Sequence, residues 1–371
     1  MTKQENWLKR LSEAGIENPA GELRCILRHH EERGARRGDP WMTTAPAGLR
    51  HDDAILEEII TRRCAREPLA KILGYKGFWK DDFLTNEHTL DPRPDSETLI
   101  EVCLDLYRYP DALSLRHSDM LSLRHPERAA RRISLQHTQE DPSAAPQDDD
   151  MPKKILELGV GTGCLILSLL KEFPGATGVG VDISEEALKI ARQNALRHRE
   201  ILEENRGDPF LDGQDPQGAR HDDAVSTIGR LTLLKSDWFN ALRHPEVQPK
   251  GLLEFAVRRS FADAQDDGVN DQDDIAKFDL IISNPPYISE DEQINEEAKY
   301  DPKLALYAKD KGLAAYKIIL RDASEFLMPN GYLVLEIGPS WDISQCKTEL
   351  TYIKTVKDLA GHDRVVVFRK T

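Results

Sequence analysis

Short apolar runs alternate with helically periodic segments from residue 151 to the end of the chain. The apolar runs, each the length of a strand, are 154–158, 178–182, 231–234, 278–282, 332–337, 352–357 and 364–368. The helical segments are 164–171, 184–196, 313–326 and 343–350. This alternation predicts an α/β fold with a doubly wound, mostly parallel sheet of seven strands. Because only residues 358–363 separate the last two runs, we expect these to form a terminal antiparallel hairpin.

The first 75 residues have the periodicity of helices instead. Apolar residues at helical spacing lie in the segments 7–16, 22–30 and 53–66. We therefore predict a small helical domain over residues 1–75. Residues 76–109 follow as an interdomain linker, in which a turn rich in glycine and aromatic residues leads into a hairpin over 83–90. Ser96 is the expected N-cap of a helix over 97–107.

Three polar stretches interrupt this pattern, at 110–150, at about 206–229 and at about 243–275. They lack periodicity, and a Leu-Arg-His triplet that recurs in and around them accounts for six of the 11 histidines. The triplet has no fixed period, which excludes a solenoid. We interpret the stretches as related inserted sequence in surface loops, because long loops add little closure entropy and this composition cannot bury a core. Two of these inserts fall inside the α/β domain of residues 151–371.

An alternative is that the histidines and aspartates of the inserts bind metal. The recurring Leu-Arg-His triplet explains why these histidines are present without assigning them a metal-binding role. The five scattered cysteines have no paired metal-ligand spacing, so we predict no metal site. Scattered cysteines are typical of reduced thiols in a cytosolic protein. The first residues show no secretory signal and no apolar run has transmembrane length. We therefore expect a cytoplasmic protein without membrane contact.

Charge narrows the classes of partner. The 371 residues have a formal net charge of −15 at pH 7. A protein that wraps nucleic acid needs a broad basic surface, and this balance does not predict one. We therefore expect no direct binding of nucleic acid, although a short basic patch is not excluded by the total charge.

The tetrapeptide Asn284-Pro285-Pro286-Tyr287 follows directly after the buried run 278–282. The two prolines have no N–H for a sheet ladder and fix φ near −65°, so the strand ends in a rigid loop. Asn284 offers a hydrogen-bond donor and an acceptor together, which complement another amide or an amino-heterocycle. Tyr287 can cover the face of a planar group. A lone Asn-Pro would favour a simple turn, but this tetrapeptide downstream of a glycine-rich loop favours a functional site.

Three further segments lie at the ends of other predicted strands. The glycine loop Gly159-Val160-Gly161-Thr162-Gly163 allows a sharp turn and a close approach to a ligand, with a purely structural turn as the alternative. Asp182 can accept both hydroxyls of a ribose, or cap the next helix, a role that suits Ser184 better. Asp237 and Trp238 suit the edge and the face of an adenine, or simply belong to the core.

Ligands of open α/β sheets bind at the carboxyl ends of the strands, so these four segments are expected to meet in one site. Together and in this order they resemble the class I S-adenosylmethionine methyltransferases, which have a Rossmann-like sheet. The tetrapeptide further resembles that of methyltransferases acting on planar nitrogen. Their targets are the amino groups of adenine or cytosine, or the side-chain amide of glutamine.

The rest of the chain resembles the HemK/PrmC family. These protein-(glutamine-N5) methyltransferases modify the glutamine of the Gly-Gly-Gln motif in class 1 peptide chain release factors. The resemblance is carried by residues 67–74, 78–79, 90–97, 300–306, 312–313, 335–338 and 358–365, and it covers nearly everything outside the three inserts. One departure is Asp91, which stands where an apolar residue is common in the family.

The resemblance implies a role for each candidate residue. The glycine loop would hold the methionine part of S-adenosylmethionine, Asp182 its ribose, and Asp237 and Trp238 its adenine. Asn284, which also borders the cofactor, and the carbonyl of Pro285 would accept hydrogen bonds from the glutamine NH₂. Pro286 and Tyr287 would complete the substrate site. The helical domain would recognise the release factor.

Two other interpretations remain open. A DNA or RNA amino-methyltransferase would use the same tetrapeptide on a flipped base. It would need a basic groove, which the acidic balance of the chain speaks against. In the other interpretation, the protein binds the cofactor but catalyses no reaction, because its inserts disable the site.

Overall fold

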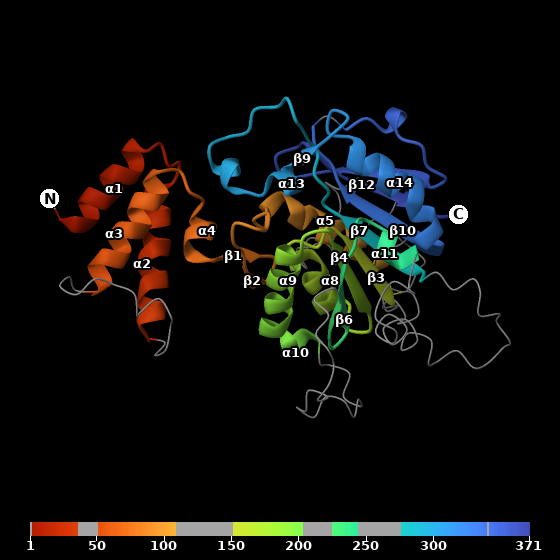
Figure 1. Cartoon of the computed structure of the whole chain (residues 1–371), viewed down its shortest axis with the longest axis horizontal. Coiled ribbons are helices and arrows are strands. Elements are labelled where there is room, and N and C mark those ends of the chain that lie inside the picture. Colours follow the sequence, from red (N-terminus) through yellow and green to blue (C-terminus); the bar gives the residue numbers. More distant parts are fainter. Residues whose placement is uncertain (1, 36–50, 109–150, 203–224, 244–275, 340) are drawn as a thin grey trace, which may run out of the picture.

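The computed structural model describes residues 2–35, 51–108, 151–202, 225–243, 276–339 and 341–371. The N-terminal part is helical, with α1 (Lys3–Glu13), α2 (Pro19–Ala35), α3 (His51–Cys64) and α4 (Leu69–Leu73) at one end of the molecule (Figure 1). A capping box begins α1, because the Thr2 hydroxyl accepts from the Glu5 N–H while the Glu5 carboxylate accepts from the Thr2 N–H. These helices bury a small core of their own that includes Trp7, Ile26 and Ile60.

Eight strands form the central sheet, in the order β11-β12-β10-β7-β3-β4-β6-β5. Their bounds are β3 (Lys154–Leu158), β4 (Thr177–Asp182), β5 (Val225–Ile228), β6 (Leu231–Lys235), β7 (Phe278–Ser283), β10 (Leu327–Glu336), β11 (Thr351–Lys357) and β12 (Asp363–Arg369). The five strands from β10 to β6 pair in parallel, whereas β12 is antiparallel to both β10 and β11. The predicted doubly wound, Rossmann-like sheet with a terminal antiparallel hairpin is confirmed, and it is the fold of class I methyltransferases.

The number of strands differs from the predicted seven because of β5, which pairs antiparallel to β6 at the sheet edge. This strand lies inside the stretch 206–229 that was predicted to be a polar insert, so that stretch ends in regular structure. The Thr227 and Thr232 hydroxyls are 3.2 Å apart across the pair. Four residues of mixed polarity beside a long polar run give almost no alternation, which is why the pattern did not reveal the strand.

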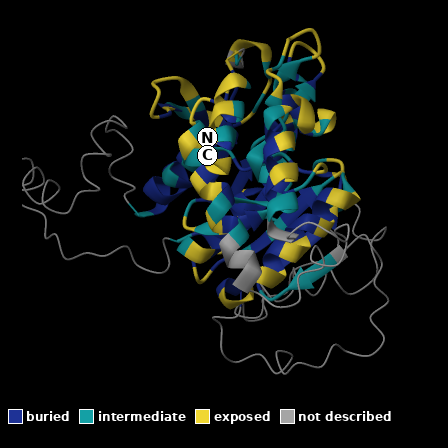
Figure 2. Cartoon of the chain, turned by 90° about the vertical axis from the view of Figure 1, so that its left-hand side faces the viewer, coloured by how far each residue is buried: buried dark blue, intermediate teal, exposed yellow. Residues whose placement is uncertain are grey.

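Helices cover both faces of the sheet. On one face lie α5 (Glu97–Arg108), α8 (Cys164–Glu172), α9 (Glu185–Arg197) and α10 (Arg199–Leu202), and on the other α11 (Asn240–Arg243) and α14 (Ala314–Phe326). Successive side chains of a strand point to opposite faces, so Leu280 and Ile282 belong to the first core and Ile281 to the second. Buried residues concentrate along this layer (Figure 2).

The predicted hairpin is misplaced. It consists of β1 (Tyr75–Phe78) and β2 (Asp81–Leu84), not of residues 83–90, because Trp79 and Lys80 make the turn, Trp79 with a φ of 57°. Residues 85–90 form a loop instead. Their short polar side chains form hydrogen bonds with nearby backbone groups. For example, Asn86 Oδ1 accepts from the His88 N–H at 2.9 Å.

Two helix predictions also need correction. Ser96 is not an N-cap, because it belongs to a 3₁₀ turn, η2 (Pro94–Ser96), that runs directly into α5. Residues 343–350 form only the short 3₁₀ turn η8 (Ile343–Gln345). There the side chains of Asp342 and Thr348 accept from the N–H groups of Ser344 and Leu350, which offers the backbone an alternative to a helix.

The segment after β7 returns toward the helical domain before α14 begins. It contains β8 (Ile288–Ser289), the 3₁₀ turn η7 (Glu297–Tyr300), α13 (Lys303–Leu306) and β9 (Tyr307–Ala308), with β8 and β9 paired in parallel. This segment lies above the carboxyl ends of the central strands in Figure 1. It therefore helps to enclose the region in which the predicted site residues lie.

Candidate active site

A cavity of about 430 Å³ opens at the carboxyl ends of β3, β4, β6 and β7. The predicted site residues that line it are Gly159, Val160, Gly161, Thr162, Asp182, Asp237, Trp238, Asn284 and Pro286. The four segments that the sequence put at strand ends therefore meet in space. Residues 88–93 and 302–309 contribute the opposite wall. Three other predicted residues, Gly163, Pro285 and Tyr287, lie beside this cavity without lining it.

The glycine loop has a backbone that only glycine adopts readily. Gly159, Gly161 and Gly163 have φ of 72°, 53° and 78°, in the left-handed region. An added Cβ at Gly159 or Gly161 would meet no atom within 4 Å, so these two positions face open space. At Gly163 it would lie 3.5 Å from the Ala191 side chain, so this third glycine permits close packing against α9 instead.

Asp182 connects the glycine loop to the start of α9. Its Oδ2 accepts from the Gly161 N–H and its Oδ1 from the Ser184 N–H, each at 2.9 Å. Burial raises the pKa of Asp182, and the backbone N–H groups oppose that shift. The predicted cap is present, since the Ser184 hydroxyl accepts from the Ala187 N–H. Asp182 is thus a carboxylate held rigidly in the wall of the cavity.

Glu157 and Cys164 flank the glycine loop and are structural. Glu157 Oε2 accepts from the Ile166 N–H at 3.0 Å, near the start of α8. Burial raises the pKa of Glu157 well above its ordinary value, and that of the Cys164 thiol to about 12. A thiol held neutral in this way packs as a small apolar group and is not a nucleophile at neutral pH.

Trp238 has a φ of 52°, which is uncommon for any residue other than glycine. Ser236 holds this conformation, because its hydroxyl donates to the Trp238 carbonyl at 2.7 Å and accepts from the Ala241 N–H at 3.0 Å. The Trp238 ring is partly buried against the core under α14 and also lines the cavity. A backbone outlier that aims an aromatic ring into a cavity is typical of a ligand site.

Asn284 is the point where the first cavity meets a second one of about 280 Å³. The two share Leu90, Arg93, Asn284 and Ala305, and the second is also lined by Tyr287 and Glu336. Burial raises the pKa of Tyr287 to about 12, so its phenol stays protonated. Gly338 permits this position of the ring, because an added Cβ would lie only 2.4 Å from it.

A chain of hydrogen bonds lies behind Asn284. Asn284 Nδ2 donates to Ser96 Oγ at 3.2 Å, and Ser96 Oγ lies 2.5 Å from Glu336 Oε2. Ser96 and Glu336 are buried and were not predicted as site residues. Both lie in segments that carried the family resemblance, 90–97 and 335–338, which was the available signal. Local periodicity cannot bring them together, because 240 residues separate them.

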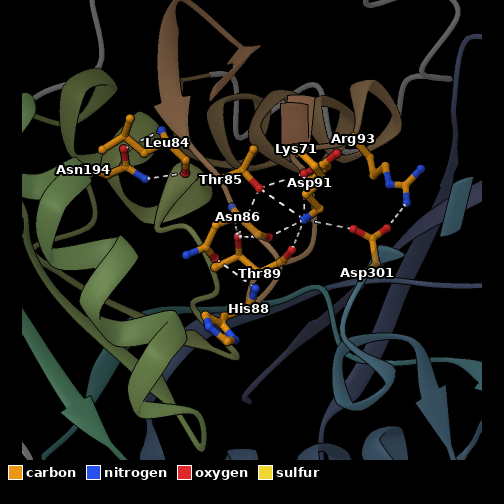
Figure 3. Close-up of polar contacts among 10 residues, drawn as sticks. All are labelled: Lys71, Leu84, Thr85, Asn86, His88, Thr89, Asp91, Arg93, Asn194 and Asp301. Atoms are coloured by element: carbon orange, nitrogen blue, oxygen red, sulfur yellow. Dashed lines mark hydrogen bonds and ion pairs between the residues drawn. The ribbon is translucent and has the colours of Figure 1, made fainter. Parts of the chain in front are cut away.

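Lys71 of α4 anchors the loop that forms the opposite wall (Figure 3). Its buried ammonium group donates to the carbonyls of Asn86, at 2.6 Å, and of Thr89. It also forms ion pairs with Asp91 at 2.9 Å and with Asp301 at 3.1 Å. Residues 88–93 line the first cavity, so a cation from the helical domain helps to shape the candidate site.

Two other kinds of feature are absent from the described part of the chain. None of its helices combines the length and apolarity needed to cross a membrane. Within the same residues, no group of three histidine, cysteine, aspartate or glutamate side chains is arranged to hold a metal ion.

Two family models match the sequence. A model described as a methyltransferase domain matches residues 149–201, and one described as an Eco57I restriction-modification methylase matches residues 178–348. Among solved structures, a crystal structure of TrmN from Thermus thermophilus is 16% identical with a TM-score of 0.32 and covers 59% of this chain and 44% of that one. The strand order and the match to the methyltransferase-domain model identify the fold as that of the class I methyltransferases.

Curated relatives extend over most of the chain. A bifunctional methyltransferase of Rickettsia felis is 33% identical over 84% of this chain and 47% of its own length, so the chain spans about half of such relatives. A release factor glutamine methyltransferase of Agrobacterium fabrum is 28% identical over 98% of this chain and 94% of its own length. A second, from Caulobacter vibrioides, is 29% identical over 96% of this chain and 92% of its own length. The resemblance predicted from the sequence motifs is confirmed.

Proposed function

We propose that this HemK/PrmC-like chain transfers a methyl group from S-adenosylmethionine to the side-chain amide nitrogen, N5, of a glutamine. The glutamine is that of the Gly-Gly-Gln motif in class 1 peptide chain release factors, which would place the enzyme in the cytoplasm. The observation that carries the proposal is the position of Asn284 between two cavities. One has the features of a cofactor site, and the other is open to a side chain from outside.

The residues of the first cavity fit S-adenosylmethionine. Gly159 and Gly161 leave open space where a side chain would stand, so a ligand can approach the backbone closely. Asp182 is a fixed acceptor at the end of β4, suited to ribose hydroxyls, and the carboxylate of Asp237 and the ring of Trp238 suit the edge and face of an adenine. The cofactor supplies an electrophilic methyl group on a sulfonium.

The second cavity supports a glutamine as the acceptor. Asn284 Nδ2 is engaged by Ser96, which leaves the Asn284 Oδ1 as an acceptor for a ligand. Pro285 lies two residues beyond the end of β7 (Phe278–Ser283) and outside its pairing registers, so its carbonyl is not engaged in the sheet ladder. Two acceptors therefore suit the two hydrogens of an amide NH₂, and Tyr287 provides an apolar surface beside them.

These acceptors would also assist the reaction. An amide nitrogen is a poor nucleophile because its lone pair is delocalised into the carbonyl. Acceptors on both of its hydrogens orient the nitrogen and stabilise the positive charge that develops there in the transition state. Holding the nitrogen in line with the methyl group supplies much of the remaining acceleration. No general base is needed early, because the N–H becomes acidic only as the new bond forms.

The helical domain supports recognition of a protein substrate. A single glutamine must be chosen by its surroundings, and a separate domain beside the catalytic one provides additional contact surface. Arg63 and Arg66 of this domain both form ion pairs with Glu297, at 2.9 and 3.2 Å. Glu297 precedes Ala298, which lines the second cavity together with residues 292–295.

The Asn284→Ala variant tests the proposal. Loss of the Oδ1 acceptor removes an interaction that strengthens in the transition state, so kcat should fall about a hundredfold. The cofactor dissociation constant, measured by calorimetry with S-adenosylhomocysteine, should change by no more than about twofold. Asn295→Ala, at a residue that lines only the second cavity, is the matched control and should keep most of the activity. An unchanged kcat in Asn284→Ala would contradict the assigned role.

An amino-methyltransferase acting on DNA is the second candidate. The match of residues 178–348 to a restriction-modification methylase model favours it. That match includes the tetrapeptide at 284–287, which the two classes share by resemblance. The net charge of −15 and the coverage of about nine-tenths of two release factor glutamine methyltransferases weigh against it.

A further inference from the structure

The hydrogen bonds behind Asn284 determine which end of its amide faces the substrate. Ser96 is 3% exposed and Glu336 1%, so each relies mainly on protein partners for its hydrogen bonds, although Ser96 borders the first cavity and Glu336 the second. A serine hydroxyl has one proton and two lone pairs. When the Glu336 carboxylate is ionised, the proton of Ser96 must point to it, across 2.5 Å. Ser96 can then only accept from Asn284, which presents its NH₂ group at 3.2 Å.

We infer that Ser96 and Glu336 are positioning residues that hold the Asn284 amide with its oxygen toward the acceptor cavity. The catalytic consequence rests on the proposed function, whereas the orientation of the amide does not. A reversed amide would present N–H groups to the NH₂ of an incoming glutamine. Two donors would then face each other and the acceptor on which the reaction depends would be absent.

The charge of Glu336 decides between these two orientations. A protonated Glu336 donates its own hydrogen to Ser96 Oγ, and the Ser96 proton is then free to turn toward Asn284. Ser96 then no longer has to accept from Asn284, and a reversed amide would present its oxygen to that proton. Burial raises the pKa of Glu336 to about 7, so the change of state falls within an ordinary assay range.

Several charged and titratable groups face Glu336 and set this ionisation. They come from the turn before α5, the loop after β7, α14 and β12, and they are Arg93, Asp95, Tyr287, Tyr316 and Arg364. Arg364 and Arg93 favour the ionised form and Asp95 opposes it. Burial remains the largest influence, so Glu336 gives up its proton at a higher pH than an exposed glutamate.

The Glu336→Gln variant tests the inference through kinetics. The neutral amide can donate to Ser96 at every pH, as the protonated acid does, and it no longer forces the Ser96 proton to point toward it, so the orientation of Asn284 is released and kcat should fall about tenfold or more while the S-adenosylhomocysteine affinity is kept. In the wild type, kcat should rise with pH through about 7 and level off above it, because the ionised form is the active one. The variant should lack this rise. Glu349→Gln is the matched control, since Glu349 accepts from Ser324 at 3.1 Å in an exposed Ser–Glu pair.

A spectroscopic measurement tests the orientation without turnover. With ¹⁵N-asparagine labelling, the Asn284 side-chain amide resonances are identified by their loss in Asn284→Ala. They should shift as the pH is lowered through about 7, and should shift at constant pH in Ser96→Ala but not in Glu349→Gln. Ser96→Thr keeps the hydroxyl and should restore the wild-type resonances and kcat. If Glu336→Gln fails to fold, Ser96→Ala provides a second variant that tests the same inference.

The outcomes separate the inference from the proposed function. A wild-type enzyme that methylates release factor, with unchanged kcat and pH profile in Glu336→Gln, would overturn the inference alone. Asn284 resonances that ignore pH and Ser96→Ala would overturn it as well. Resonances that respond as expected in a protein that does not modify release factor would uphold the amide orientation and reject the proposed substrate.

Discussion

A single buried ammonium group, that of Lys71, shows how much one residue contributes to the wall of the cavity. Its side chain is 5% exposed, as is that of Asp91, and the Asp301 side chain is 1% exposed. An apolar residue is common at this position in the family that the chain resembles, and the ion pair with Lys71 shows how Asp91 is accommodated here. The Thr85 hydroxyl also donates to Asp91, at 2.7 Å (Figure 3). The carboxylate is tolerated inside because a cation and a hydroxyl are placed there for it.

Lys71→Met should therefore be strongly destabilising. It leaves Asp91 buried without a cation, whereas Asp301 keeps the ion pair with Arg93 at 2.6 Å. Breaking a buried pair in this way costs about 3–5 kcal/mol in the free energy of unfolding, which urea denaturation of the full chain would measure. In Lys71→Met/Asp91→Asn the loss should be smaller than in Lys71→Met, because the stranded charge is gone.

Lys9→Met is the matched control for that series. Lys9 pairs with Glu13 at 3.6 Å, and both side chains are more than half exposed, so its removal should change stability by less than about 1 kcal/mol. Equal effects of Lys9→Met and Lys71→Met would contradict the role assigned to the buried cation.

At the scale of elements, the amino-acid sequence predicted the strands that matter for the site. β3, β4, β6 and β7 are short apolar runs that are buried on both faces, and such runs are readable without tertiary information. Residues at their ends, such as Asp182 and Asn284, could be placed by the rule that ligands bind at carboxyl ends. The pattern of apolar residues did not predict β5, whose position at the sheet edge determines its structure. It also failed for residues 343–350, where side-chain hydrogen bonds determine the backbone conformation.

The site contacts that the sequence pattern did not predict were missed for one common reason. Ser96 meets Glu336 across 240 residues, and Lys71 meets Asp301 only when the segment after β7 folds back over the helical domain. Such contacts depend on the packing of whole elements, which local periodicity does not encode. Family resemblance marked the segments 90–97 and 335–338 without indicating that their side chains touch.

The elements that flank the first and the third predicted insert are held close together. Tyr107 near the end of α5 donates to the Asp279 carbonyl, and the N–H groups of Lys153 and Lys154 donate to the Asp279 carboxylate. Arg243 and Lys277, on either side of the third insert, both bond to Glu325. Contacts among the described residues thus join the chain across these stretches, which supports their interpretation as insertions.

Shortening the first insert should consequently leave the enzyme intact. Replacing residues 112–148 by a six-residue Gly-Ser linker still spans roughly 20 Å, enough to join two ends that share Asp279 as a partner. A shorter loop also loses slightly less entropy on closure. We expect an unfolding midpoint at or slightly above that of the full chain and a methyl-transfer rate within about twofold of it. A large loss of either would show that the insert belongs to the fold or to the site.

At the scale of the whole molecule, the helical domain contacts the segment after β7, part of which lines the cavity proposed for the acceptor. Besides the pairs of Arg63 and Arg66 with Glu297, the Tyr300 hydroxyl donates to the Ala65 carbonyl at 3.1 Å. A protein bound to both domains would bring a loop to the second cavity, where Asn284 and Tyr287 lie. The net charge of −15 is compatible with this arrangement and unfavourable for a nucleic-acid duplex.

Methyl transfer to defined acceptors tests the central claim most directly. The chain is incubated with methyl-labelled S-adenosylmethionine and, in separate reactions, a purified class 1 release factor, its Gly-Gly-Ala variant and duplex DNA. Our expectation is label on the wild-type factor alone, with peptide mass spectrometry assigning one added methyl group to the Gly-Gly-Gln glutamine. Label on the DNA, or equal label on the variant factor, would contradict it, as would bound cofactor without transfer to any acceptor.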